Sequence, residues 1–210
     1  MSKVISVDKE EYEINELQEA IKAIRSGKMV VYPTETVYGL GADATSDEAV
    51  SRVFEAKSRS FDRPVSIAVD SLSMCYRVGK LYREEETLIR EFLPGPLTVL
   101  VEPRPVLSDV LSADTGKVGI RIPDLSVTRK LIESVGGPIT STSANVSGRP
   151  SPTTVADALN QLGGSVAVAI DIGESTLGTS STVVEVLEGD VEIIREGPVS
   201  RSQIVSALSD

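Results

Sequence analysis

Apolar residues along the chain recur with two spacings, which separate the expected helices from the expected strands. The first helix is expected over residues 14–26, whose apolar positions three and four apart are Ile14, Leu17, Ile21 and Ile24. Gly27 follows at the position where such a helix ends. Short continuous apolar runs bounded by glycine, proline or polar residues instead indicate buried strands.

The same spacings predict the remaining elements. Thr45 and Glu48 have capping-box spacing and open a helix that reaches Lys57. Further helices are expected over 84–93, 126–135, 154–162 and 200–208. Strands are expected at 4–7, 29–33, 65–69, 97–101, 118–123, 138–141 and 166–171. Two more strands are expected within 181–197, joined as a hairpin around Glu188-Gly189-Asp190.

Helices and strands alternate along much of the chain, but some neighbouring strands have no helix between them. This arrangement predicts an α/β fold with a mixed sheet rather than a purely parallel one. The sequence contains no internal repeat, low-complexity tract or linker. Residues 1–210 are therefore expected to form a single compact domain, which is within the size range of one domain.

Composition narrows the chemistry. The chain contains no histidine, which excludes a Ser-His-Asp triad, a His-ligated zinc site and imidazole acid–base catalysis. Its carboxylates are dispersed, so no dedicated metal site is expected. A single cysteine, no signal peptide and no apolar run long enough for a membrane span favour a cytoplasmic protein without membrane contact. The net charge of −10 argues against phosphate binding over the whole surface, but allows one local basic cleft.

A cluster of cations ends the second expected helix. Lys57, Arg59 and Arg63 lie within seven residues in "KSRSFDR", immediately before an apolar run. Cations at a helix C-terminus can simply complement the helix dipole. The same residue types also form phosphate clamps, because arginine presents a planar fork to phosphate oxygens and lysine a compact charge. The cluster alone does not decide between these two interpretations.

Two stretches of small polar residues follow expected strands. "STSANVSGRP" (141–150) contains more hydrogen-bonding side chains than a single turn needs, and its glycine would let backbone amides approach an anion. "YPTETVYGLG" (32–41) places threonines and glycines after another strand but lacks the lysine of a P-loop. Each is also compatible with an ordinary turn. Ligands of open α/β sheets favour strand ends, so we expect a binding site there.

Two arginines lie in apolar surroundings, Arg121 in "VGIRIP" and Arg195 in "EIIREG". An unpaired buried charge is costly, so each side chain must reach either an anionic ligand or a carboxylate partner. A structural salt bridge and a ligand contact both satisfy this requirement.

Several motifs occur together in the order typical of the YrdC/YciO family. They are "YPTETVYGLGADA", "KSR", "PGPLTVLV", "VGIRIPD", "SANVSGRPSPT" and "SSTVVEV" with "IIREG". The resemblance extends from about residue 15 to residue 200. The chain is similar to the catalytic domain of longer relatives. It implies a twisted mixed parallel and antiparallel sheet, flanked by helices, with a concave basic cleft.

The resemblance also implies an activity, that of an L-threonylcarbamoyladenylate synthase. Such nucleotidyltransferases convert ATP, bicarbonate and L-threonine into threonylcarbamoyl-AMP and pyrophosphate, with Mg²⁺ delivered by the ATP. A partner threonylcarbamoyl transferase complex then modifies adenosine 37 of tRNA. Binding of tRNA or double-stranded RNA is implied as well.

Site residues follow from the resemblance only where residues match the family motifs. Lys57 and Arg59 match its catalytic K-x-R pair at the phosphates. The implied ATP-binding residues are Lys57, Arg59, Arg63, Lys117, Ser143, Asn145, Arg149 and Arg195. The implied threonine-binding residues are Thr36, Arg121, Ser141 and Ser181.

The sequence departs from the synthase pattern at three positions. Arg63 replaces an asparagine, Ala68 replaces a histidine near threonine, and Lys117 stands where a threonine is common. These departures resemble the YciO branch and leave two alternatives open. One is a tRNA- or double-stranded-RNA-binding protein without synthase activity, and the other is a related enzyme that uses a different amine.

Overall fold

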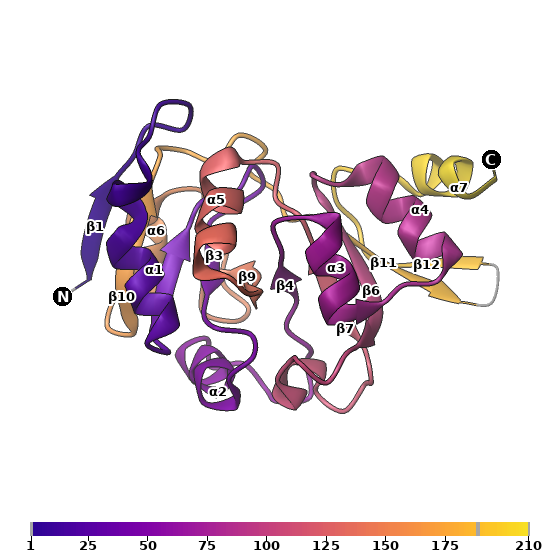
Figure 1. Cartoon of the computed structure of the whole chain (residues 1–210), viewed down its shortest axis with the longest axis horizontal. Helices are drawn as coiled ribbons and strands as arrows, with labels where there is room; N and C mark the ends of the chain where they lie inside the picture. Colours follow the sequence, from indigo (N-terminus) through magenta and orange to yellow (C-terminus); the bar gives the residue numbers. More distant parts are fainter. Residues whose placement is uncertain (1, 188–189, 210) are drawn as a thin grey trace.

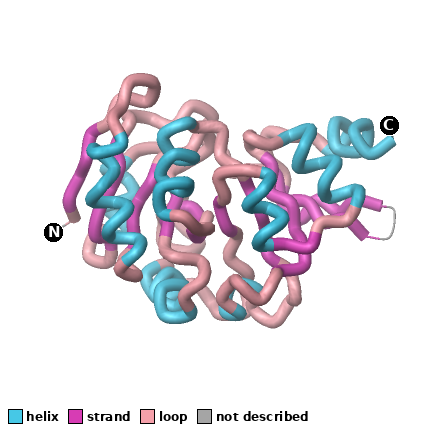
Figure 2. The backbone as a smooth tube through the Cα atoms, viewed as in Figure 1, coloured by secondary structure: helices cyan, strands magenta, loops and turns pink. Residues whose placement is uncertain are grey.

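A computed structural model describes residues 2–187 and 190–209. Within these residues the strands form two mixed sheets that lie next to each other in an elongated molecule (Figure 1). Figure 2 shows helices in front of both sheets, and loops with short helical segments along the lower edge. The prediction of an α/β fold with mixed strand pairing is confirmed, but the strands divide between two sheets instead of forming one.

The five-stranded sheet contains the N-terminal strand and has the order β1-β10-β2-β3-β9. Its strands are β1 (Lys3–Ser6), β10 (Val166–Asp171), β2 (Met29–Tyr32), β3 (Gly39–Gly41) and β9 (Thr142–Ser143). The first three are parallel, and β3 is antiparallel to both β2 and β9. The polar loop after β2 therefore lies at an end of the sheet close to β9.

The seven-stranded sheet has the order β12-β11-β6-β7-β4-β8, and β5 pairs with β6 beside this path. Its strands are β12 (Asp190–Arg195), β11 (Thr182–Leu187), β6 (Leu97–Pro103), β7 (Val118–Arg121), β4 (Ile67–Ala68), β8 (Ile139–Thr140) and β5 (Gly79–Lys80). Strands β11 and β12 pair antiparallel, as the expected hairpin requires. Residues 188 and 189 of the expected turn lie outside the described residues.

One short segment joins the two sheets. Strand β8 belongs to the seven-stranded sheet and β9 to the five-stranded sheet, with only Ser141 between them. Thr140 fixes the junction, because its backbone N–H donates to the Ala42 carbonyl (2.9 Å) and its hydroxyl accepts from the Ala42 N–H (3.0 Å). The polar stretch that begins at Ser141 is therefore held where the ends of both sheets meet.

The helices cover both sheets. They are α1 (Gln18–Arg25), α2 (Asp47–Ala56), α3 (Leu72–Val78), α4 (Arg83–Phe92), α5 (Ser126–Val135), α6 (Val155–Leu162) and α7 (Arg201–Ser209), with 3-10 turns η1 (Ile14–Leu17) and η2 (Asp109–Ser112). Helices α1 and α5 lie in front of the five-stranded sheet and α6 behind it (Figure 1). None of these helices is long and apolar enough to cross a membrane.

Apolar burial holds each helix in place. Helix α1 buries Ile21 and Ile24, which the spacing predicted, while η1 places Leu17 in the core and leaves Ile14 more than one-third exposed. Full burial of one such side chain contributes about 1.5–3 kcal/mol. A core of these residues joins both sheets and continues through the seven-stranded one to α7.

Some local predictions are wrong. The predicted first helix begins as the 3-10 turn η1, and Ser46 rather than Thr45 caps α2, since its hydroxyl accepts from the Ala49 N–H (3.3 Å). Thr45 instead donates to the Asp43 carboxylate. Strand β3 forms in a stretch expected to be a loop, and α3 was not predicted. The strand expected over 65–69 is only two residues long.

Gly39→Ala is expected to destabilise the fold. A Cβ at Gly39 would lie 2.7 Å from the ring of Tyr32, which is fully buried and whose hydroxyl donates to the Thr140 carbonyl (3.1 Å). Overpacking of this kind costs about 1–3 kcal/mol. Urea unfolding measures the loss, and Gly137→Ala serves as the control, because a Cβ there meets no atom within 4 Å. Equal midpoints for Gly39→Ala and the parent protein would contradict the expectation.

Candidate substrate-binding site

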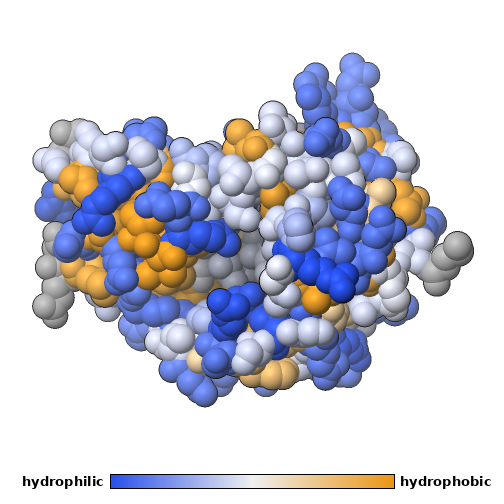
Figure 3. Space-filling model, turned by 180° about the vertical axis from the view of Figure 1, so that it is seen from behind, coloured by the Kyte–Doolittle hydropathy of each residue, from blue (hydrophilic) through white to orange (hydrophobic). Residues whose placement is uncertain are grey.

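A polar cavity of about 130 Å³ opens between the ends of the two sheets. Serines and threonines make up most of its lining, and three arginines complete the polar part: Thr34, Thr36, Arg59, Ser66, Thr98, Arg121, Ser141, Thr142, Ser143, Ser180, Ser181 and Arg195. The face seen in Figure 3 is hollowed between the two halves, and hydrophilic residues flank the hollow. Hydroxyls both donate and accept, so the lining suits a small, strongly polar ligand.

Both sheets contribute to the cavity. Thr34 and Thr36 follow β2, Thr98 lies in β6, and Arg121 is the last residue of β7. Ser181 immediately precedes β11, and its hydroxyl lies 2.8 Å from that of Thr98. The expected concentration of polar groups at strand ends is therefore found, and it combines segments more than 140 residues apart in sequence.

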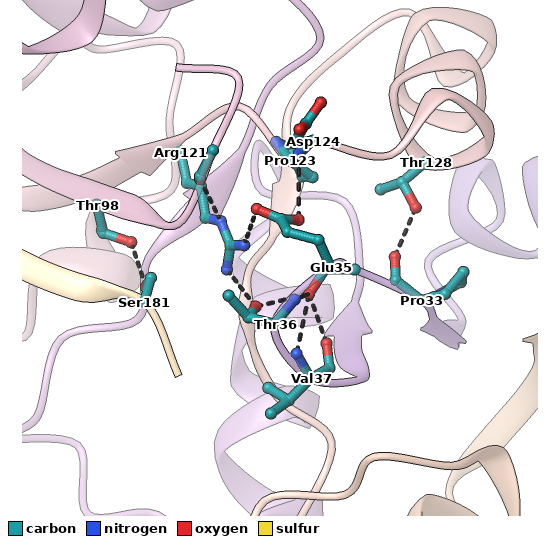
Figure 4. A network of polar contacts seen from close by, with 12 residues as sticks. Pro33, Glu35, Thr36, Val37, Thr98, Arg121, Pro123, Asp124, Thr128 and Ser181 are labelled. Carbon is teal, nitrogen blue, oxygen red and sulfur yellow. Dashed lines mark hydrogen bonds and ion pairs between the residues drawn. The ribbon is translucent and has the colours of Figure 1, made fainter. Parts of the chain in front are cut away.

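Arg121 lies at the centre of the polar network drawn in Figure 4. Its guanidinium donates to the Thr36 hydroxyl (Nη1–Oγ1, 2.8 Å) and to the Gly95 carbonyl (Nε–O, 3.2 Å). The Thr36 hydroxyl lies 2.8 Å from that of Thr34. Arg121, Thr36 and Ser181 therefore surround one cavity, as their expected common role requires.

The carboxylate partner of Arg121 is Glu35. Its Oε1 accepts from Nη2 of Arg121 at 2.6 Å, and its Oε2 accepts from the Asp124 backbone N–H at 3.1 Å. The pair is almost completely buried, with 6% of the Arg121 side chain and 12% of the Glu35 side chain exposed. Both outcomes expected for a buried arginine thus coincide, because Arg121 is paired with an acid and also lines a cavity.

Within the described residues, the other two arginines of the cavity donate hydrogen bonds only to uncharged groups. Arg59 donates to the carbonyls of Arg63 (2.9 Å) and Pro64 (2.6 Å), and Arg195 donates to the carbonyl and hydroxyl of Ser181. Burial lowers the pKa of Arg59, and the nearby charge of Arg63 adds to this effect. Burial also lowers the pKa of Arg195, and repulsion from Arg121 and Arg59 lowers it further. The cavity therefore concentrates positive charge.

Lys57 lies outside the cavity lining, although it is only 1% exposed. Its ammonium donates to the carbonyls of Asn145 (2.7 Å) and Ser143, so it faces neither an acid nor the cavity. The amide of Asn145 in turn donates to the carbonyls of Val146 (2.9 Å) and Arg149 (2.7 Å). Lys57 and Asn145 thus fix the loop that begins at Ser143, the last residue of β9.

Ser141 and Ser143 line the cavity as expected, whereas the remaining expected positions lie outside its lining. Arg63 and Arg149 are exposed, and Lys117 forms an ion pair with Glu185 (3.7 Å). Ala68 is fully buried in β4 and does not line the cavity. These cations can reach only a ligand that extends beyond the cavity.

Local sequence patterns do not single out several residues of this candidate site. Ser66 and Thr98 line the cavity. Each is the only hydroxyl residue in its apolar run, "VSIAV" or "LTVLV", and a single hydroxyl in a buried strand is a sequence signal for a site residue. Glu35 lies within the polar stretch "YPTETVYGLG". Its pairing with a residue 86 positions away in sequence leaves no local pattern.

Lys57 is expected to make stability depend on pH. Burial, with a further effect of Arg59, lowers its pKa from 10.5 to about 7. Between these two values the unfolded chain keeps a proton that the folded protein has lost, so the free energy of unfolding rises with pH. Each pKa unit corresponds to about 1.4 kcal/mol.

The measurement is urea unfolding from pH 6.5 to 10 for the parent protein and for Lys57→Met. The parent should gain stability relative to the variant as pH rises through this window. A difference between the two proteins that does not change with pH would contradict the lowered pKa.

Fold and site together define an α/β protein with a polar, arginine-lined cavity at the junction of two mixed sheets. The model of the Sua5/YciO/YrdC family, described as "Telomere recombination", matches residues 22–197. The chain belongs to this family, which confirms the resemblance found in the sequence.

Curated and solved relatives agree with this assignment. The chain is 38% identical over 188 residues to the threonylcarbamoyl-AMP synthase of Pyrococcus abyssi, covering 89% of this chain and 55% of that protein. It thus spans about half the length of that relative. The crystal structure of P. abyssi Sua5 complexed with L-threonine superposes with a TM-score of 0.93 at 37% identity, covering 98% of this chain and 61% of that one. Escherichia coli YciO has the same fold (TM-score 0.89, 21% identity, 97% of this chain and 100% of that one).

Proposed function

We propose that this protein is a nucleotidyltransferase, an L-threonylcarbamoyladenylate synthase that forms threonylcarbamoyl-AMP and pyrophosphate from ATP, bicarbonate and L-threonine. The observation that carries this proposal is the small cavity in which Arg121, Thr36 and Ser181 converge. The similarity to the P. abyssi threonylcarbamoyl-AMP synthase and to the structure of P. abyssi Sua5 with L-threonine supports it.

The size of the cavity favours an amino acid. Its volume of about 130 Å³ equals that of roughly four water molecules, since each occupies about 30 Å³ in the liquid. Pockets for drug-sized ligands measure about 300–1,000 Å³. L-threonine would place its carboxylate against Arg121 and its polar groups among Thr36, Ser141 and Ser181.

ATP must lie largely outside this cavity, with its phosphates entering it to reach Arg59 and Arg195. Arginine forks suit phosphate oxygens, and Ser143 lies between the two subsites. Further along the nucleotide, the proposed contacts are Arg63, Lys117, Asn145 and Arg149. Arg59 is the proposed catalytic cation, and Lys57 supports it as a positioning residue by fixing the backbone of Ser143 and Asn145.

The proposed chemistry consists of two steps. The threonine amine and bicarbonate first combine to a carbamate with loss of water. A carbamate oxygen then bonds to the α-phosphorus of ATP, the bond from that phosphorus to the bridging oxygen breaks, and pyrophosphate leaves with the electron pair. ATP, bicarbonate and the carbamate are anions, so arginines that neutralise their charge lower the barrier. Positioning and charge suffice for such a transfer, which agrees with a chain without histidine.

Magnesium would arrive with the nucleotide. Among the described residues that line the cavity none carries a carboxylate, and no group of three histidine, cysteine, aspartate or glutamate side chains in that part of the chain could hold a metal ion. These residues do not fit a resident Mg²⁺ site, because this ion prefers carboxylate oxygens, phosphates and water.

Threonylcarbamoyl-AMP is a reactive mixed anhydride, so a transferase must consume it. We propose a threonylcarbamoyl transferase complex acting on tRNA as that partner. Exposed Arg63 and Arg149 would provide contacts for tRNA or double-stranded RNA. Such binding should weaken steeply with salt, because phosphate contacts release counterions.

Pyrophosphate release tests the proposal. ATP, bicarbonate and L-threonine together should give release, and omission of any one should abolish it. Other amino acids in place of threonine identify a related enzyme that uses a different amine. No release with any amino acid, together with salt-sensitive RNA binding, would replace the synthase proposal with the RNA-binding alternative.

A further inference from the structure

The three arginines of the cavity differ in charge compensation. Arg121 is neutralised by Glu35, whose carboxylate is 2.6 Å away and almost completely buried (Figure 4). Within residues 2–187 and 190–209, neither Arg59 nor Arg195 takes part in an ion pair. Arg121 is therefore paired with an acid, whereas Arg59 and Arg195 line the same cavity without a carboxylate partner in that part of the chain.

Glu35 is rigidly held in this role. Its second carboxylate oxygen accepts from the Asp124 N–H (3.1 Å), and its backbone carbonyl accepts from the Leu177 N–H (2.8 Å) in the loop leading to Ser181. Of the five N–H groups of a guanidinium, Arg121 commits three to Glu35, Thr36 and Gly95. Two N–H groups remain, which is the number that one carboxylate accepts in a forked pair.

We infer that Glu35 is a specificity-determining residue that reserves Arg121 for a carboxylate and keeps phosphate away from this arginine. An uncompensated arginine there would attract a phosphate or pyrophosphate group at least as strongly as an amino-acid carboxylate, because attraction scales with the charge of the ligand. With Glu35 in place, Arg121 contributes hydrogen bonds but little net charge. The triphosphate then collects at Arg59 and Arg195. This inference rests on the proposed function, which places both ligands in one cavity.

The test is calorimetric titration of pyrophosphate into the parent protein and into Glu35→Gln, each with and without saturating L-threonine. In the parent, threonine should change the pyrophosphate affinity less than threefold, because the two ligands use different arginines. In Glu35→Gln, pyrophosphate should bind about tenfold tighter, and threonine should weaken it about tenfold, because both ligands now use Arg121.

Two further single variants isolate the charge. Glu35→Asp retains a carboxylate and should behave like the parent. Glu85→Gln, a buried glutamate in the capping turn of α4, should also behave like the parent, because it lies away from the cavity. Parent-like pyrophosphate affinity and no competition in Glu35→Gln would overturn the inference.

The double variant Glu35→Gln/Arg121→Gln keeps the test decisive if Glu35→Gln does not fold, because it leaves no buried charge unpaired. It should bind pyrophosphate like the parent and lose L-threonine. Loss of pyrophosphate binding in the double variant would overturn this inference but not the proposed function. Competition between the two ligands in the parent would have the same consequence. A parent protein that binds pyrophosphate but not L-threonine would overturn the proposed function, and the inference with it.

Discussion

Replacing Arg59 with alanine should lower ATP-dependent pyrophosphate release by about 10²–10³-fold, the effect of losing one group that stabilises charge in a transition state, or about 2.7–4 kcal/mol. Arg59 faces the cavity and has no carboxylate partner within the described residues, so its charge is free for phosphate. The side chain contacts only two carbonyls of its own loop. The free energy of unfolding should therefore fall by no more than about 1 kcal/mol.

Arg52→Ala is the matched control for Arg59→Ala. Arg52 lies on α2 and contacts Glu48 and the Gly27 carbonyl, far from the cavity lining. Its loss should leave pyrophosphate release within about twofold of the parent. Full activity of Arg59→Ala under subsaturating ATP would show that this arginine is not part of the phosphate subsite.

Replacing Arg121 with lysine should weaken L-threonine binding by one to two decades while ATP binding stays nearly unchanged. Lysine can still pair with Glu35, so the buried charge remains compensated. It cannot present the planar fork, and the loss of a hydrogen bond to a charged group costs about 1.5–3 kcal/mol. Titration of L-threonine in the presence of ATP and bicarbonate measures the effect.

Arg129→Lys provides the control for this exchange. Arg129 on α5 contacts the Pro123 carbonyl and Asp124 but does not line the cavity. The Arg129→Lys variant should therefore bind L-threonine as tightly as the parent protein. A larger loss of ATP binding than of threonine binding in Arg121→Lys would contradict the assignment of Arg121 to the amino-acid subsite.

Local patterns predicted most of the elements, because burial imposes regular spacing on the sequence. The apolar run "LTVLV" lies within β6, and residues 126–135 form α5 as expected. The division into two sheets could not be predicted in this way. It depends on the reversal at Ser141 and on the pairing of Thr140 with Ala42, contacts between segments nearly 100 residues apart.

The same limit applies to the site. Residue type and context indicated that Arg121 needs a partner, and its presence beside Thr36 and Ser181 agrees with the family motifs. The identity of Glu35 as that partner follows only from the fold. Lys57 illustrates the opposite case, because its cationic cluster suggested direct phosphate contact, whereas burial directs its ammonium to the carbonyls of Ser143 and Asn145.

The proposed activity is tested most directly by identifying its product. The protein would be incubated with ATP, L-threonine and carbon-13 bicarbonate, and the nucleotides separated and analysed by mass spectrometry. The expected products are threonylcarbamoyl-AMP that contains one carbon-13 and an equal amount of pyrophosphate. The Arg59→Ala variant should form much less of both. An adenylate without the label would contradict the proposal. Unchanged ATP would contradict it as well, provided that a known synthase, used as the positive control, is active in the same assay.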